Sequence, residues 1–326
     1  MSDAPKVVFH PTKPYEPPSR FWRGAHRQLL MAEWIKNKRT PALPWRSEEL
    51  SLGEGQGFVR MFRLMPATPI KGVLVAFHGL GGTADGPNLR RFARTAAYRG
   101  YVVVSVEMLG AGGAGPIPRL YTAADTGVFD AAAAIPGLRV PGLPLLFCGV
   151  SLGGGMLLRW LGLRGDDAPI DGVLTLSPIG HLPSSAEALA RFGNRFYDRR
   201  FASLYASRLG AVVGDSRAPF DARRHKTMRA LDEDFASFWA EHPDAASYYE
   251  FASAHRTAGR IARPTLIIAS ADDPFAPPGP LTSHYGGLPN VDLRMSRFGS
   301  HVAFLDRRNG GLEPVFPELL LDPLER

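Results

Sequence analysis

The stretch Pro144–Arg164 reads PLLFCGVSLGGGMLLRWLGLR and decides the fold of this 326-residue chain. Its first part, Leu145–Val150, is a short apolar run typical of a buried strand, and its last part, Met156–Leu163, is an apolar, leucine-rich run that predicts a helix. Ser151 stands between them in Gly-Val-Ser-Leu-Gly. A sharp strand–turn–helix of this kind lifts a serine hydroxyl clear of the sheet, where it can act as a nucleophile.

Glycines surround this serine at positions 149, 153, 154 and 155. The predicted helix doubles back over the predicted strand, so the residues between them must be small. A glycine-rich turn with an incidental serine is the alternative, because the chain has 35 glycines and the five-residue motif is short. The strand-like run before it and the helix-like run after it favour the nucleophile.

Composition limits the classes of protein that this chain can be. With 45% apolar residues it can form one large α/β domain with an insertion, or two modest domains. No apolar run reaches the length of a membrane helix, and the first 20 residues are rich in charge and proline, unlike a secretory signal. We therefore expect a cytoplasmic protein without a membrane anchor, making at most transient lipid contacts. The single cysteine, Cys148, is expected to be a small apolar side chain buried in the core.

The net charge of +7 does not by itself indicate a nucleic-acid partner. Lysines and arginines are scattered, with short clusters such as Arg199-Arg200 and Arg223-Arg224-His225-Lys226, and no nucleic-acid-binding motif accompanies them. Attraction to anionic headgroups or acyl carriers stays open. The histidines form no metal-binding pair, and Gly79-x-Gly81 lacks the third glycine of a dinucleotide loop because residue 84 is alanine. No metal and no cofactor are expected.

Strands and helices are predicted to alternate along most of the chain, which indicates parallel strands with right-handed crossovers. The predicted strands are Gly57–Leu64 at an edge, Lys71–Phe77, Tyr101–Val106, Leu145–Val150, Asp171–Leu176, Pro264–Ser270 and Val291–Met295. Outside residues 180–260, the predicted helices are Phe21–Lys38, Asn88–Arg99, Tyr121–Ile135 and the one after Ser151. We expect loops at Thr40–Gly55 and Leu109–Gly115, and a stretch poor in helix between Pro274 and Val291.

The alternation stops at Ser177-Pro178, and residues 180–260 are predicted to be helical, with aromatic residues among charges. An insertion after a central strand is expected to cover the active site as a cap, and some of its aromatics could line an acyl pocket. Most of them are expected to pack within the cap. The predicted organisation is an N-terminal arm and helix (1–55), a core (56–179 and 261–326) and a helical cap (180–260).

Two further residue types needed to activate a serine follow Ser151 in the chain. Asp272-Asp273-Pro274 follows one predicted strand, and Gly299-Ser300-His301 follows the last, at the same sheet edge as Ser151. A neutral imidazole can remove the serine proton, and a buried carboxylate fixes the imidazole tautomer. We assign Ser151, Asp273 and His301 as the catalytic residues. Asp272 is the rival carboxylate, better suited to capping the turn.

An oxyanion hole is expected from two backbone N–H groups. One belongs to Leu80, in the turn His78-Gly79-Leu80-Gly81-Gly82 at the end of a predicted strand, and the other to Leu152, directly after the nucleophile. His78 is expected to be a structural member of that turn, hydrogen-bonded to the backbone.

These motifs resemble the YheT-like branch of the α/β-hydrolase domain (ABHD) family of esterases and lipases. The resemblance covers roughly residues 20–306. The matching segments are His78–Gly82, Gly149–Gly154, Leu231–Phe235, Ala246–Tyr249, Asp272–Phe275 and Gly299–Val302. It implies an α/β-hydrolase fold, with a mostly parallel central sheet flanked by helices and a helical cap inserted after the sixth strand. It also implies hydrolysis of carboxylic esters with short, medium or lipid-like acyl chains.

Two segments depart from the family pattern and leave substrate preference open. Relatives usually carry His-Leu-Gln-Thr where this chain has His26-Arg27-Gln28-Leu29, and Arg-Gly where it has Leu109-Gly110. The alternatives to an esterase are an acyltransferase or thioesterase with the same three residues, and a protein that only binds a small hydrophobic ligand. The last is disfavoured because all three catalytic residue types are present.

Overall fold

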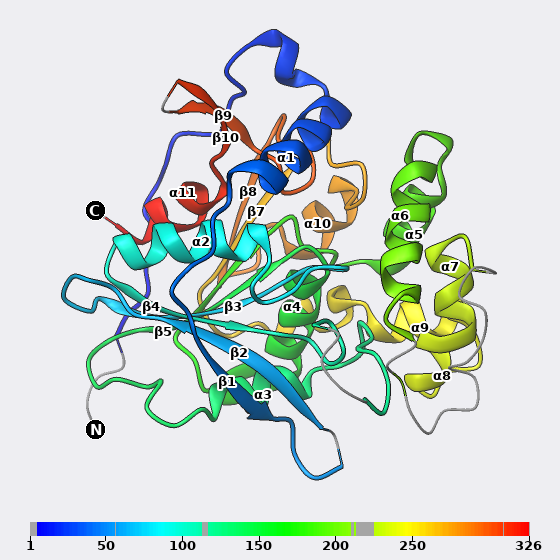
Figure 1. Ribbon diagram of the computed structural model, residues 1–326, viewed down its shortest axis with the longest axis horizontal. Helices are drawn as coiled ribbons and strands as arrows, with labels where there is room; N and C mark the ends of the chain where they lie inside the picture. Colours follow the sequence, from blue (N-terminus) through cyan, green and yellow to red (C-terminus); the bar gives the residue numbers. More distant parts are fainter. Residues whose placement is uncertain are drawn as a thin grey trace.

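The computed structural model describes residues 5–55, 57–112, 117–209, 212, 225–308 and 310–325, with the backbone alone at 37–39. Its centre is an eight-stranded sheet in the order β1-β2-β4-β3-β5-β6-β7-β8 (Figure 1). The strands are β1 (Arg46–Ser51), β2 (Phe58–Leu64), β3 (Gly72–Phe77), β4 (Tyr101–Val106), β5 (Leu145–Val150), β6 (Gly172–Leu176), β7 (Thr265–Ser270) and β8 (Val291–Ser296). Within this sheet, over the residues that the structure describes, only the pairs β1–β2 and β2–β4 are antiparallel, so the predicted mostly parallel sheet is confirmed.

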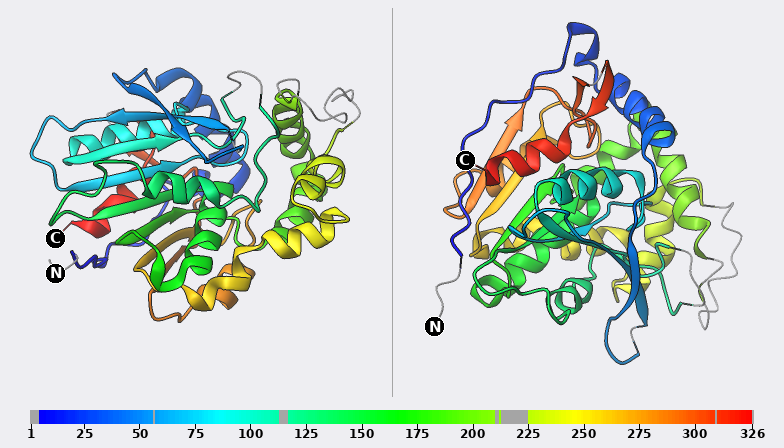
Figure 2. Two further views of the ribbon diagram at one scale, coloured as in Figure 1. Left: turned by 90° about the horizontal axis from the view of Figure 1, so that it is seen from below. Right: turned by 60° about the vertical axis from the view of Figure 1, so that its left-hand side comes forward.

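Helices cover both faces of the sheet because its central strands are apolar on both sides (Figure 2). On one face, Val73, Val75 and Phe77 of β3 join a core with α3 (Gly127–Ala133) and α4 (Leu152–Arg164). On the other face, Leu74 and Ala76 join a second core with α2 (Pro87–Tyr98) and α11 (Phe316–Leu321). The two-residue period of a strand therefore divides the core into two layers.

A helical insertion stands between β6 and β7, to one side of the sheet (Figure 1). Its elements are α5 (Leu182–Ala190), η3 (Phe192–Asn194), α6 (Arg195–Ala206), α7 (Met228–Leu231), η6 (Asp232–Ala236), α8 (Ser237–Trp239), α9 (Ala245–Ala252) and η7 (Ala254–Arg260). Residues 210, 211 and 213–224, including part of the basic cluster at 223–226, lie outside the described residues. The interpretation of 180–260 as a cap stays a prediction.

Three segments differ from the sequence-based expectations. The predicted loop at 40–55 contains β1, a polar strand that pairs with β2 and so makes β2 an inner strand. The stretch between Pro274 and Val291 contains α10 (Pro278–Tyr285), because prolines in the first turn of a helix cost no hydrogen bond. Beyond β8 the chain forms the hairpin β9 (Leu305–Arg308) and β10 (Gly311–Pro314), which alternation of strands and helices did not indicate.

Two predicted helices are shorter than expected. The predicted helix at 21–38 is divided by Gly24 into η1 (Arg20–Arg23) and α1 (Ala25–Arg39). Of the predicted helix at 121–135, only α3 is helical, because the Asp125 carboxylate accepts a hydrogen bond from the Thr122 N–H (2.6 Å) and holds a turn there. Residues 113–115 of the predicted glycine-rich loop lie outside the described residues.

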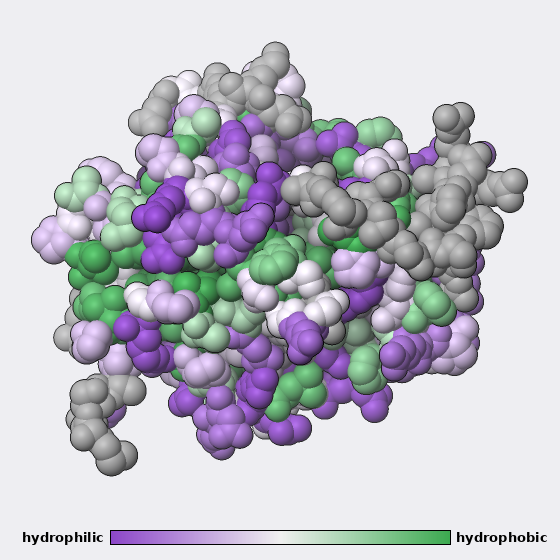
Figure 3. Space-filling view, turned by 60° about the horizontal axis from the view of Figure 1, so that its bottom comes forward, coloured by the Kyte–Doolittle hydropathy of each residue, from purple (hydrophilic) through white to green (hydrophobic). Residues whose placement is uncertain are grey.

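The surface mixes polar and apolar residues. Figure 3 shows one face, on which an apolar band lies between polar regions, as is usual for a globular protein. Within the described ranges, none of the helices has the length and apolar character that crossing a bilayer would require.

Replacing Gly155 by alanine is expected to destabilise the protein by about 2–4 kcal/mol. A Cβ at this position would collide with the carbonyl oxygen of Ile179, a backbone atom that cannot rotate away. Chemical denaturation measures the effect. The matched control is Gly127→Ala, where a Cβ would meet nothing within 4 Å and stability should change by no more than about 0.5 kcal/mol. Equal stabilities of the two variants would contradict the close contact between Gly155 and the Ile179 carbonyl.

Candidate active site

Ser151 occupies the turn between β5 and α4, in a conformation that few side-chain-bearing residues adopt. Its φ is 56° and its ψ is −123°. This positive φ carries strain, and the surrounding hydrogen bonds hold it in place. The Ser151 N–H donates to the carbonyl of Leu176 (2.9 Å), and its own carbonyl accepts from Gly155 (3.0 Å) and Ile179 (3.1 Å).

The glycines next to Ser151 allow three backbone segments to approach one another. A Cβ on Gly153 would collide with the carbonyl of His78, and one on Gly149 would lie 2.7 Å from the Cα of Gly154. A Cβ on Gly79 would lie 2.8 Å from that of Ser151. The turn after β3 therefore lies directly against the serine.

The structure brings Ser151, His301 and Asp273 together in one hydrogen-bonded chain. The distance from Ser151 Oγ to His301 Nε2 is 2.7 Å, and that from His301 Nδ1 to Asp273 Oδ2 is 2.8 Å. Because Nδ1 faces a carboxylate, it carries the proton in the neutral ring, which leaves Nε2 free to accept the serine proton. This arrangement can activate a hydroxyl without any other group.

The two neighbouring aspartates make different contacts. Asp273, which is buried, also accepts hydrogen bonds at Oδ1 from the N–H groups of Phe275 (2.8 Å) and Ala276 (2.9 Å). Asp272 instead accepts from the N–H of Ser300 (2.8 Å), and burial raises the pKa of its carboxyl. Asp273 therefore contacts the imidazole, while Asp272 holds the backbone beside it.

The loop that carries His301 is strained on both sides of the histidine. Ser300 and Val302 have φ values of 57° and 61°. Side chains from two strand ends hold this loop: Ser270 Oγ donates to the Ser300 carbonyl (2.7 Å), and Ser177 Oγ accepts from the Val302 N–H (3.2 Å). The imidazole thus has a fixed position relative to the sheet.

Both residues predicted to form the oxyanion hole line the same cavity as Ser151 and His301. Leu80 lies in the turn after β3, and Leu152 is the first residue of α4. The first N–H groups of a helix have no partner within the helix, which is what the role predicted for the Leu152 N–H requires.

His78 makes the backbone hydrogen bonds expected of a structural residue. Its Nδ1 is 2.8 Å from the Gly79 carbonyl, and its Nε2 is 3.1 Å from the backbone nitrogen of Met108. Nδ1 is therefore the donor and Nε2 the acceptor, which requires a neutral ring. Burial lowers the pKa of His78 to about 4, and the nearby charge of Arg208 also lowers it.

A cavity of about 750 Å³ opens over Ser151. Its walls come from the turn after β3, from α1 and from the helical insertion, with apolar side chains that include Leu152, Leu182, Leu189, Phe201, Tyr248 and Phe275. Charged residues such as Lys36, Arg199 and Lys226 also line it. Among the described residues, no cluster of three or more His, Cys, Asp or Glu side chains is arranged to bind a metal.

Sequence reasoning missed two residues that contact the segments on either side of the site. Gln28, fully buried, accepts from the Leu305 N–H (3.2 Å) just beyond His301 and from the Tyr15 hydroxyl (3.0 Å). A glutamine inside an apolar helical pattern was the available signal. Arg208 Nη2 donates to the carbonyls of Gly81 (3.1 Å) and Gly82 (3.4 Å), and no motif around it distinguished it from other arginines.

Most of the chain matches the model of a known family. The model of the family described as serine aminopeptidase, S33 (Hydrolase_4), matches residues 68–307, well over half of the chain. The chain belongs to this family. The hydrolase is 28% identical over 300 residues to YheT of Escherichia coli (strain K12), covering 88% of this chain and 86% of YheT.

Two eukaryotic relatives carry names that describe an activity. Human phospholipase ABHD3 is 25% identical over 328 residues, which are 95% of this chain and 79% of the relative. Medium-chain fatty acid ethyl ester synthase/esterase 2 of Saccharomyces cerevisiae is 25% identical over 265 residues, 73% of this chain and 59% of the relative. The predicted relation of this hydrolase to the YheT-like ABHD group is thus confirmed.

Solved structures share the fold. The Pyrococcus furiosus esterase Pf2001 has a TM-score of 0.50 and 13% identity, with 92% of this chain and 91% of that chain covered. A puromycin-hydrolyzing peptidase of Mycobacterium tuberculosis has a TM-score of 0.51 and 19% identity, with 80% of this chain and 36% of that chain covered. At these identities the likeness concerns the fold alone.

The buried neutral His78 predicts a loss of stability in acid. The pKa of His78 falls from the ordinary 6.5 to about 4 on folding. Between these pH values His78 is therefore protonated in the unfolded chain and neutral in the folded protein. The free energy of unfolding therefore decreases as the pH falls from about 6.5 to about 4. His78→Gln, neutral at every pH, should remove about 1–3 kcal/mol of this decrease. Urea denaturation at pH 7.5 and 4.5 tests this, and equal pH dependence in both proteins would contradict it.

Proposed function

We propose that this hydrolase cleaves carboxylic esters through an acyl-enzyme on Ser151, with His301 as the general base and acid and Asp273 as the carboxylate that orients it. The observation that carries the proposal is the hydrogen-bonded chain from Ser151 Oγ to His301 and on to Asp273, with distances of 2.7 and 2.8 Å. The names of the ABHD3 and yeast relatives, a phospholipase and an ester synthase/esterase, favour an ester as the substrate.

The proposed reaction has two halves. His301 Nε2 takes the proton of Ser151 as Oγ attacks the ester carbonyl, and the N–H groups of Leu80 and Leu152 bind the oxyanion. His301 then gives that proton to the leaving alcohol. In the second half it removes a proton from water, which attacks the acyl-enzyme, and it gives that proton to Ser151 Oγ as the carboxylic acid leaves. Asp273 stabilises the imidazolium in both halves.

The cavity supports a small or medium-sized acyl substrate. Its volume of about 750 Å³ lies within the range of pockets that bind drug-sized ligands, and its apolar walls suit an acyl chain. Residues of α5, α6 and α9 form part of these walls, which favours the helical insertion at 180–260 as a cap over Ser151. The charged residues at the cavity suit transient contact with lipid headgroups.

Acyl transfer is the second candidate. The yeast relative is named both synthase and esterase, and the same acyl-enzyme serves both reactions if an alcohol replaces water. An alcohol acceptor is added at increasing concentration, and the ratio of new ester to carboxylic acid formed separates the two activities.

Ser151→Ala is expected to abolish ester turnover and labelling by a fluorophosphonate probe, because both need the nucleophilic oxygen. Labelling is mapped by mass spectrometry of the modified peptide, and turnover by hydrolysis of p-nitrophenyl esters of graded chain length. His301→Ala should also lose labelling. Activity of Ser151→Ala near that of the wild type would refute the assignment.

Asp273→Asn should lower kcat by about 10³- to 10⁴-fold, because an amide can no longer fix the imidazole tautomer. Asp272→Asn is the matched control, since it keeps an oxygen that can accept from the Ser300 N–H and should retain kcat within about tenfold. Reversal of the two effects would make Asp272 the functional carboxylate.

Ala186→Phe on α5 should shift the preferred acyl chain to a shorter length, because this residue lines the cavity and a ring would occupy part of it. Glu187→Phe, exposed on the same helix, is the control and should leave the chain-length profile unchanged. Profiles of kcat/KM against acyl length measure both. An unchanged profile in Ala186→Phe would exclude this wall of the cavity as the acyl site.

A further inference from the structure

Arg208 of the helical insertion contacts the turn that follows β3. It lies two residues beyond the end of α6, is partly buried, and donates through Nη2 to the carbonyl oxygens of Gly81 (3.1 Å) and Gly82 (3.4 Å). Hydrogen bonds from a guanidinium are stronger than those from a neutral donor because the charge assists them. The insertion thus places a cation on the turn that contains Leu80.

Hydrogen bonds inside this turn connect Arg208 to the Leu80 N–H. The carbonyl of Gly81 belongs to the same peptide group as the Gly82 N–H, which donates to the Gly79 carbonyl (3.0 Å). His78 Nδ1 donates to that carbonyl as well (2.8 Å). The Gly79 carbonyl in turn belongs to the peptide group that carries the Leu80 N–H.

Consecutive hydrogen bonds polarise one another, so a donor at one end strengthens the donor at the other. We propose that Arg208 is a positioning residue for the oxyanion hole: it fixes the turn and polarises the Leu80 N–H through the peptide groups of Gly81 and Gly79. This inference rests on the proposed ester hydrolysis, because it concerns the oxyanion formed in that reaction. It makes the position of the insertion a condition for full activity.

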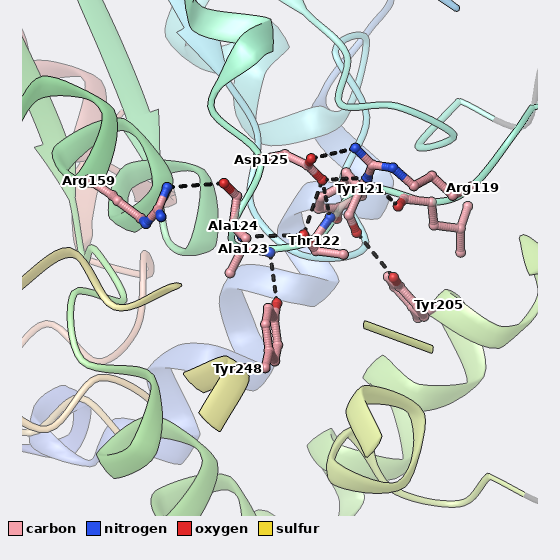
Figure 4. A network of polar contacts seen from close by, with 10 residues as sticks. Arg119, Tyr121, Thr122, Ala123, Ala124, Asp125, Arg159, Tyr205 and Tyr248 are labelled. Atoms are coloured by element: carbon pink, nitrogen blue, oxygen red, sulfur yellow. Dashed lines mark hydrogen bonds and ion pairs between the residues drawn. The ribbon is translucent and has the colours of Figure 1, made fainter. Parts of the chain in front are cut away.

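A second set of contacts, through Tyr121, holds the same turn. The Gly81 N–H donates to the hydroxyl of Tyr121 (3.4 Å). Tyr121 is held by the insertion, since the Tyr205 hydroxyl donates to its carbonyl (3.1 Å) (Figure 4). The Tyr248 hydroxyl accepts from the N–H of Ala123 (2.8 Å), two residues on (Figure 4). The insertion therefore makes hydrogen bonds both to the turn at 78–82 and to the segment 121–123 that contacts this turn.

The test compares Arg208→Ala, Arg208→Lys and Arg208→Gln on a p-nitrophenyl ester of short chain. We expect Arg208→Ala to lower kcat by about 10- to 100-fold, a part of the loss that follows removal of one oxyanion donor, with KM within about threefold of the wild type. Affinity for a trifluoromethyl ketone, which forms an oxyanion on Ser151, should fall by the same factor. Arg208→Lys keeps a charged donor and should recover most of kcat.

A purely structural role for Arg208 would give a different pattern. It would lower thermal stability or the fraction of active protein, without a matched loss of kcat and ketone affinity. If Arg208→Ala does not fold, Arg208→Gln is compared with Arg208→Lys. A loss of kcat and of ketone affinity by the same factor in the glutamine variant supports the proposal. Equal kcat and ketone affinity in the two variants overturn it. Arg191→Ala, an exposed arginine after α5, is the control and should keep wild-type kinetics.

The proposed function and this inference fail in distinguishable ways. If the wild-type protein neither labels with the fluorophosphonate nor turns over esters, the proposed function itself fails. If the wild type is labelled at Ser151 while Arg208→Ala keeps kcat and ketone affinity, only the role of Arg208 is overturned. A rise in KM at constant kcat would also overturn it, since it would make Arg208 a substrate contact.

Discussion

The close approach of α4 to the turn after β3 is the constraint on which the rest of the site depends. Backbone atoms of residues 77–79, 149–155 and 179 occupy space that a Cβ would need, so the glycines of this region set the distance between Ser151 and the turn. The same approach places Leu152, the first residue of α4, in the wall of the cavity. A strained serine backbone persists there because its carbonyl and N–H are both hydrogen-bonded to surrounding segments.

Parallel strands then bring distant residues to one place. The carboxyl ends of β3, β5, β7 and β8 lie at the same sheet edge, so the turn at 78–82, Ser151, Asp273 and His301 meet although 28 to 150 residues separate the hydrogen-bonded pairs. This edge is also where the helical insertion leaves the sheet and where its residues line the cavity. One topological feature thus determines the location of both Ser151 and the cavity.

The core of the fold could be predicted from the sequence because local patterns indicate its elements: apolar runs of strand length indicate buried strands, and glycine-rich segments indicate sharp turns. β3, β4, β5, β6 and β7 were recognisable in this way, as were the glycines that surround Ser151. β1 and α10 were not, since a polar edge strand lacks an apolar pattern and three prolines obscured a helix start. Gln28 and Arg208 act through contacts with residues far away in the chain, and no local pattern reports such contacts.

The bond between Tyr15 and the Leu305 carbonyl (2.7 Å) joins positions 290 residues apart, and Gln28 adds a second link between the same regions. Closing so long a loop is entropically unfavourable, so these bonds hold only while the intervening chain is folded. Both links end at Leu305, four residues beyond His301, and the Leu305 carbonyl and N–H would lose these partners if the beginning of the chain detached. The N-terminal segment and α1 thus stabilise the start of β9.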